Sequence, residues 1–256
     1  MTRVTGIPTY VVALSAAAVL AACGGGGGED DAPASQSYGI ETLMPAVAEA
    51  VGGEDTVHLG IGDHRGRAEL QVDLTWAAKE TEFRALMGDT PGDFLEFRRV
   101  GGKMYVGGER TDNEWSYTAD DDPRALGDDD SFDAGAAPVL LALDVPGDYE
   151  AMIDAVDKVQ NQGQEEMEGV ASTHYVLTID AQAWVDQFPD DSMHRQIELD
   201  DALQVDLWID EQSLPVRMEY TGTDTGDQAR VDYSGWGTPI AVVVPEGATP
   251  LGSEAS

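Results

Sequence analysis

The chain has 256 residues, of which 49 are acidic and 14 are basic, and its formal net charge is −35. So negative a field repels phosphate backbones and anionic headgroups, which excludes nucleic acid as a partner and disfavours contact with an anionic membrane surface. The length suits one domain of moderate size, and the single cysteine leaves no partner for a disulfide bond within the chain.

The first 22 residues have the organisation of a bacterial signal peptide. Arg3 precedes an apolar stretch from residue 10 to 22 that is too short to span a bilayer. This stretch ends in Leu-Ala-Ala-Cys at residues 20–23, which reads as the lipobox that signal peptidase II recognises. We expect cleavage before Cys23 and acylation of Cys23 by chains such as palmitate, which would anchor the protein without a transmembrane helix. An ordinary signal peptide with a chance cysteine is the alternative.

The remaining chain divides into three parts. Residues 23–38 are rich in Gly, Asp, Ala and Ser, and we expect them to form a lipidated, flexible tether. A single domain follows at 39–248, and 249–256 is predicted to be a disordered tail. The expected location is the extracytoplasmic face of the cell membrane, and we expect a monomer.

The first half of the domain begins with a helix and continues with strands. Leu43, Met44, Val47 and Val51 recur at helical spacing, which predicts a helix over 40–51 that ends at two glycines. Period-two alternation then predicts strands joined by short turns. These strands lie at 57–61, 70–76, 81–87, 93–99, 103–106 and 114–118.

An acidic loop over residues 120–135 interrupts this pattern. Asp128, Asp130 and Asp133 could supply oxygen ligands to Ca²⁺, but their spacing lacks the glycine and the distal glutamate of an EF-hand loop. We favour a solvated acidic loop.

The second half combines two helices with a second set of strands. An apolar run at 137–143 is followed by a turn at Pro146-Gly147 and a predicted helix over 149–159. A hairpin follows at 160–167 and 171–180, and then a short helix at 181–188. The last strands are predicted at 203–209, 214–220 and 229–233, and residues 240–244 end the core. The fold class is therefore α+β: a strongly curved antiparallel sheet whose concave apolar face is covered by about three helices.

The sequence carries no recognisable catalytic or metal-binding motif. It has no Gly-x-Ser-x-Gly, no phosphate loop and no His/Cys/carboxylate cluster at zinc spacing. His58 and His174 are out of phase with the apolar residues of their strands and are expected to face solvent, whereas His194 lies in a loop. We therefore expect no enzyme activity, no cofactor and no metal.

Four stretches resemble one known family. They are residues 100–106 with Glu114-Trp115, residues 169–180, residues 207–220, and residues 232–245 with Tyr-Ser-Gly-Trp-Gly. Together they resemble the LppX/LprG-type lipoproteins of actinobacteria, which are similar in fold to the LolA/LolB lipoprotein carriers. The resemblance covers residues 40–247 and implies a half-open β-barrel, capped by helices, around an apolar cavity.

The resemblance also implies a function. Members of that family bind acylated lipids or glycolipids and help to move them across the cell envelope, so we expect such a lipid as ligand and a membrane lipid transporter as a candidate partner. The alternating apolar faces supply the expected cavity residues: Leu70, Val72, Leu74, Trp76, Val205, Leu207 and Ile209. A structural or interaction lipoprotein with a filled core is the alternative, because alternation alone does not distinguish a hollow core from a packed one.

Overall fold

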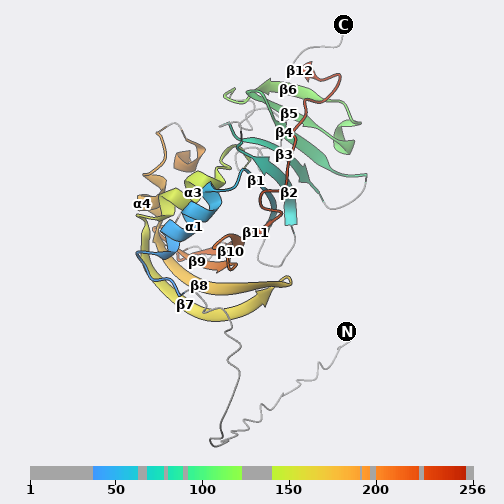
Figure 1. The fold of residues 1–256 in the computed structure, drawn as a ribbon. Helices are drawn as coiled ribbons and strands as arrows, with labels where there is room; N and C mark the ends of the chain where they lie inside the picture. The colour runs from blue at the N-terminus through green and yellow to red at the C-terminus, as the bar shows by residue number, and fades with distance from the viewer. Residues whose placement is uncertain are drawn as a thin grey trace, which may run out of the picture. The chain divides into compact units, whose positions relative to one another are not determined.

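Twelve strands form one sheet in the part of the chain that the structure describes (Figure 1). The computed structural model describes residues 37–62, 68–77, 80–88, 92–122, 140–190, 192–196, 200–224 and 228–251, all within one compact unit. The predicted signal peptide, the start of the tether and the calcium alternative at Asp128, Asp130 and Asp133 lie outside the described residues.

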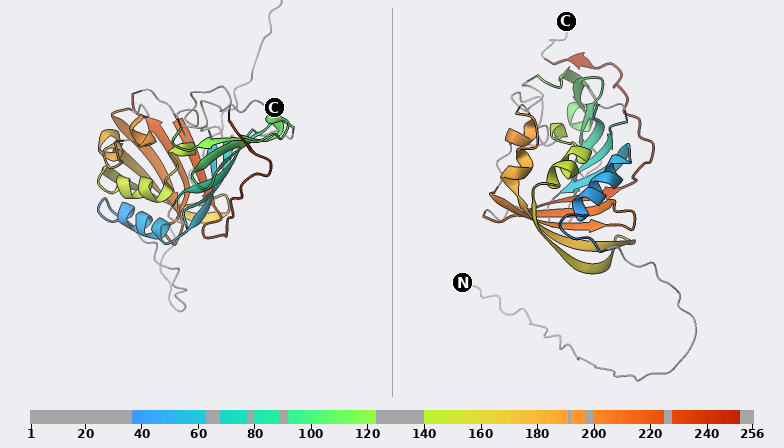
Figure 2. Two further views of the ribbon diagram at one scale, coloured as in Figure 1. Left: turned by 90° about the horizontal axis from the view of Figure 1, so that it is seen from above. Right: turned by 60° about the vertical axis from the view of Figure 1, so that its left-hand side comes forward.

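The sheet consists of two antiparallel meanders that meet edge to edge. The first contains β1 (Thr56–Gly62), β2 (Ala68–Thr75), β3 (Glu82–Met87), β4 (Leu95–Arg99), β5 (Lys103–Gly107) and β6 (Ser116–Ala119). The second contains β7 (Val156–Met167), β8 (Val170–Asp180), β9 (Ala202–Ile209), β10 (Pro215–Gly222) and β11 (Gln228–Ser234). Antiparallel pairing of β1 with β11 joins them, with Leu59 opposite Tyr233. The two meanders are thus one continuous, curved and unclosed sheet (Figure 2).

Within the described residues, three α-helices lie over the concave face of the second meander (Figures 1 and 2). They are α1 (Leu43–Gly52), α3 (Val145–Met152) and α4 (Ala181–Val185), and the described 3₁₀ helices η1 (Glu109–Thr111) and η3 (Met193–Gln196) lie in loops. Helix α1 buries the four residues that predicted it, Leu43, Met44, Val47 and Val51. None of the described helices is long and apolar enough to cross a membrane. The predicted α+β class, with a curved antiparallel sheet covered by helices, is confirmed.

The inward faces of the strands form the core as the alternation predicts. Phe83, Ala85 and Phe97 of the first meander and Tyr175, Leu177 and Ile179 of the second are all fully or almost fully buried. Burial of large apolar side chains contributes about 1.5–3 kcal/mol each. With no disulfide available, this core is the main source of stability.

The second helix was predicted with the wrong limits. Helix α3 begins at Val145, so Pro146-Gly147 form its first turn rather than a turn before it, and the Asp144 side chain caps it by accepting from the Gly147 N–H at 3.2 Å. It ends at Met152, and Val156 already belongs to β7. A β-bulge between residues 156 and 158 adds one residue to this strand, so Val156 and Val159 pack against the core although they are three apart. The bulge mimics helical spacing.

The end of the domain also differs from the prediction. Residues 240–244 form no strand, and Val243 and Val244 are 61 % and 56 % exposed. The Val243 carbonyl accepts a hydrogen bond from Arg98 Nη1 at 2.8 Å instead of pairing with a strand. Thr249 and Pro250, expected in the tail, form the two-residue strand β12 and pair in parallel with β6. The apolar run at 240–244 did not by itself show whether a strand edge of the sheet was free to pair with it.

Candidate functional site: an apolar cavity under helix α3

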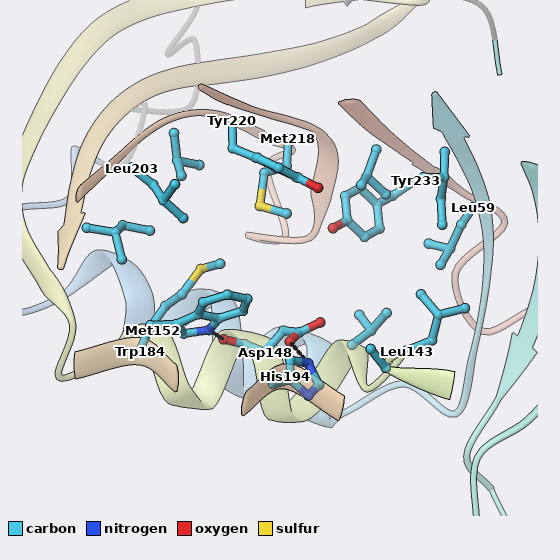
Figure 3. A pocket seen from close by; sticks show the side chains of 16 residues that line it. Leu59, Leu143, Asp148, Met152, Trp184, His194, Leu203, Met218, Tyr220 and Tyr233 are labelled. Atoms are coloured by element: carbon cyan, nitrogen blue, oxygen red, sulfur yellow. Dashed lines mark hydrogen bonds and ion pairs between the residues drawn. The ribbon is translucent and has the colours of Figure 1, made fainter. Parts of the chain in front are cut away.

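A cavity of about 280 Å³ lies between the second meander and the helices that cover it (Figure 3). Strands β1, β8, β9, β10 and β11 form one wall, and α3, α4, η3 and the segment before α3 form the other. Twelve of its sixteen lining side chains are apolar: Leu59, Ile61, Ala142, Leu143, Val145, Met152, Ile179, Trp184, Leu203, Val205, Met218 and Val231. The remaining four are Asp148, His194, Tyr220 and Tyr233. A mostly apolar cavity with a few convergent polar groups is typical of a small-molecule or lipid site.

Alternation of the strands aims these residues inward. Leu203 and Val205 on β9, Met218 and Tyr220 on β10, and Val231 and Tyr233 on β11 are spaced by two along their strands. Met218 lies opposite Leu207 and Val231 in the pairing register, so the inward positions of the three strands form continuous rows. The strand wall is therefore fixed by the hydrogen-bonded sheet.

Only one of the seven expected cavity residues, Val205, lines this cavity. The other apolar candidates on β2 and β9 are buried in the packed core: Leu70, Val72, Leu74, Leu207 and Ile209. Trp76 is half-buried with its ring centroid 6.5 Å from that of Trp236, in an edge-to-face arrangement. Strand alternation identified the inward face correctly, but it did not show where along that face helices stop filling the space.

The polar part of the cavity is a hydrogen-bonded pair that the sequence did not suggest. His194 Nε2 lies 2.9 Å from Asp148 Oδ1, across 46 residues of chain. His194 is buried between aromatic rings, stacked on Phe188 at 3.8 Å and edge-on to Trp184 at 5.8 Å. The Trp184 indole N–H donates to the Asp148 carbonyl at 3.3 Å. Together these contacts join η3 and α4 to α3.

Ser192 completes a chain of three polar side chains. Its Oγ lies 3.0 Å from His194 Nδ1 and also accepts from the His194 backbone N–H at 3.2 Å. A Ser-His-Asp series is the arrangement of serine hydrolases, in which the serine stands at the substrate site. Here Ser192 is not among the residues that line the cavity. The two contacts of Ser192 with His194 hold the imidazole in its turn.

Burial changes the acidity of the groups that face the cavity. The Asp148 side chain is only 26 % exposed, and the cavity it lines accounts for part of that exposure. Removal from water raises the pKa of Asp148 from 3.8 to about 6, with a further rise from Asp144, although the bond from His194 opposes it. Burial also raises the pKa of Tyr220, helped by the charge of Asp148, and burial raises the pKa of Tyr233. Both phenols therefore keep their protons at neutral pH.

His58 and His174 lie on the outer face of the sheet, as their alternation predicts. His58 Nδ1 is 2.9 Å from Asp73 Oδ1, with 42 % of its side chain exposed. His174 is more enclosed than expected, at 18 %, because it stacks on Trp208 at 4.3 Å and bonds to Asp206 at 2.8 Å. No group of three or more His, Cys, Asp or Glu side chains suited to a metal ion occurs among the described residues.

Comparisons with known proteins give a structural likeness without a sequence match. No family model matches the chain, and no curated protein matches it. Among solved structures, LprF from Mycobacterium bovis superposes with a TM-score of 0.55 at 18 % identity, covering 80 % of this chain and 96 % of LprF. The Mycobacterium tuberculosis lipoprotein LppX superposes with a TM-score of 0.52 at 16 % identity, covering 80 % of this chain and 98 % of LppX. The resemblance seen in the sequence is thus confirmed in the architecture, and the chain has the fold of the LppX-type lipoproteins.

Proposed function

We propose that this protein is a lipid-anchored lipoprotein of the extracytoplasmic membrane face that binds acylated lipid or glycolipid and carries it within the cell envelope. The observation that carries this proposal is the apolar cavity between β9–β11 and α3. The lipobox at residues 20–23 supports the location, and the likeness to LppX, itself a lipoprotein, supports the class of protein.

The cavity explains how such a protein would hold its cargo. Each buried CH₂ group is kept from water at a gain of about 0.8 kcal/mol, which is what an acyl chain needs while it is outside a bilayer. The apolar wall supplies contacts along the chain without a fixed pattern of polar partners. At about 280 Å³ the cavity is close to the lower limit of ligand pockets, so we expect it to enclose one chain segment while the rest of the lipid stays outside.

The alternative of an interaction lipoprotein with a filled core makes a different prediction about this cavity. In that case the space would have no ligand, and filling it would change no property except stability. The test is therefore to fill it and to measure lipid binding.

The experiment uses the chain from residue 23 with Cys23→Ser, so that no acyl group of its own competes. Organic extracts of the protein, produced in an actinobacterial host, are analysed by mass spectrometry, and binding of a fluorescent fatty acyl ester is titrated. Val231→Phe places a ring in the cavity, and Val176→Phe on the outer face of β8 is the matched control. We expect bound lipid in the parent and the control, and at least about tenfold weaker binding in Val231→Phe. Lipid-free extracts together with no ester binding in any variant would refute the proposal.

A further inference from the structure

The polar groups of the cavity are concentrated in its middle. In Figure 3, Tyr220 and Tyr233 direct their hydroxyl groups into the cavity from the strands, and Asp148 directs its carboxylate toward them from α3. Leu203, Met152 and Trp184 lie on one side of this group, and Leu59 and Leu143 lie on the other. A chain that runs through the cavity would therefore meet apolar carbon, then polar atoms, then apolar carbon again.

Asp148, Tyr220 and Tyr233 do not use up their hydrogen-bonding atoms on one another. Asp148 Oδ1 is used by His194, whereas its second oxygen, Oδ2, faces the cavity. The Tyr220 hydroxyl has no hydrogen-bond partner among the described residues, although it lies near enough to Asp148 for the carboxylate charge to raise its pKa. A plain alkyl chain lying against these groups would cut them off from water and leave them without hydrogen-bond partners, which weakens its binding.

The hydrogen-bond donors and acceptors of these three side chains indicate which chemical group of a ligand could bond to them. Asp148 is an acceptor once it is ionised, and the protonated phenols of Tyr220 and Tyr233 are donors. A hydroxyl group both donates and accepts, so it satisfies the two kinds at once. An ester or ketone carbonyl only accepts, an alkane does neither, and a carboxylate would be repelled by Asp148 and by the strongly negative chain.

We propose that the cavity selects an acyl chain that carries a hydroxyl group within its apolar length, with Asp148 accepting from that hydroxyl and Tyr220 donating to it. This inference rests on the proposed lipid-binding function and names the kind of chain that the same cavity prefers. Tyr233 lies beside the pair and supplies a second donor for the same oxygen.

The test compares neutral probes that differ only in one oxygen. These are methyl octadecanoate and its derivatives with a hydroxyl at the third, tenth or twelfth carbon, together with the twelfth-carbon ketone. Each competes with a fluorescent fatty acyl ester for the chain from residue 23 with Cys23→Ser. We expect at least one hydroxylated ester to bind about tenfold more tightly than the plain ester, and the ketone to gain less, because it cannot donate to Asp148.

Variants separate this proposal from the lipid-binding function. Tyr220→Phe removes one hydroxyl from the cavity, and Tyr105→Phe, a buried tyrosine that does not line it, is the matched control. We expect Tyr220→Phe to lose most of the preference for the hydroxylated ester and to bind the plain ester more tightly than the parent does, because the variant has no phenol hydroxyl that the plain chain would leave without a partner. Equal binding of plain and hydroxylated esters, or a preference that survives both Tyr220→Phe and Asp148→Asn, would overturn the hydroxyl assignment and leave lipid binding intact. Failure to bind any ester would overturn both.

Discussion

Asp148 makes the stability of this domain depend on pH in a direction opposite to that of most carboxylates. Its pKa is about 6 in the folded protein, against the ordinary aspartate value of 3.8 that applies to an unfolded chain. The folded protein therefore binds the proton more tightly, and folding loses stability as the pH rises through this range. The full loss is about 3 kcal/mol, and about 1.4 kcal/mol of it falls between pH 5 and pH 7.5.

The assay is urea unfolding of the parent and of Asp148→Asn at pH 5, 6 and 7.5. This pH range lies above the acid range in which most other carboxylates of the chain become protonated. The difference between the two proteins isolates Asp148 from the general repulsion of the chain. The charged or titratable groups that interact with it are Asp144, His194, Tyr149, Tyr220 and Tyr233, and the three phenols remain protonated throughout. We expect Asp148→Asn to gain about 1–1.5 kcal/mol relative to the parent from pH 5 to pH 7.5.

Two results would refute this reasoning. One is a stability difference between the parent and Asp148→Asn that does not change with pH. The other comes from His194→Gln. Because the bond from His194 lowers the pKa of Asp148, removing it should raise that pKa further and steepen the loss of stability with pH. A shallower dependence in His194→Gln would show that burial is not the dominant cause.

Three further predictions concern other parts of the chain. Cys23→Ser should move the protein from the membrane fraction to the soluble fraction in cell fractionation; retention in the membrane would contradict the lipobox interpretation. Phe83→Ala, at a fully buried ring, should lower the free energy of unfolding by about 3–5 kcal/mol, whereas Leu86→Ala on the other face of β3 should cost far less. Gly107→Ala places a Cβ 2.3 Å from the Trp115 ring, so it should destabilise by about 1–3 kcal/mol in thermal unfolding, and an unchanged melting temperature would contradict the contact.

The local alternation of apolar and polar residues predicted most of the strands, because a strand with one solvent-facing side shows this period of two directly in its sequence. The alternation over residues 70–76 and 203–209 needs no knowledge of neighbouring strands, since a side chain on the wrong face would bury a charge or expose a leucine. Pattern failed where the backbone departs from the ideal period. The bulge in β7 placed Val156 and Val159 on one face and produced the spacing of a helix.

The cavity depended on information of another kind. Val205, Leu207 and Ile209 share one face of β9, yet of these three only Val205 lines the cavity, whereas Leu207 and Ile209 are buried in the packed core. Which part of an apolar face remains uncovered is decided by the positions of α3, α4 and η3, and these positions follow from packing between distant segments.

The sequence by itself determined the curved antiparallel sheet, the helix at α1, the likeness to LppX-type lipoproteins and the prediction of a lipid anchor at Cys23. Each of these could be recognised from patterns of residues that lie close together in the chain. Only the tertiary structure decided that Asp148 and His194 meet, with Tyr220 facing the carboxylate across an apolar cavity. A carboxylate among 49 acidic residues carries no local mark of its role. Its pKa and its chemistry arise from burial and from a partner 46 residues away, and folding alone brings these together.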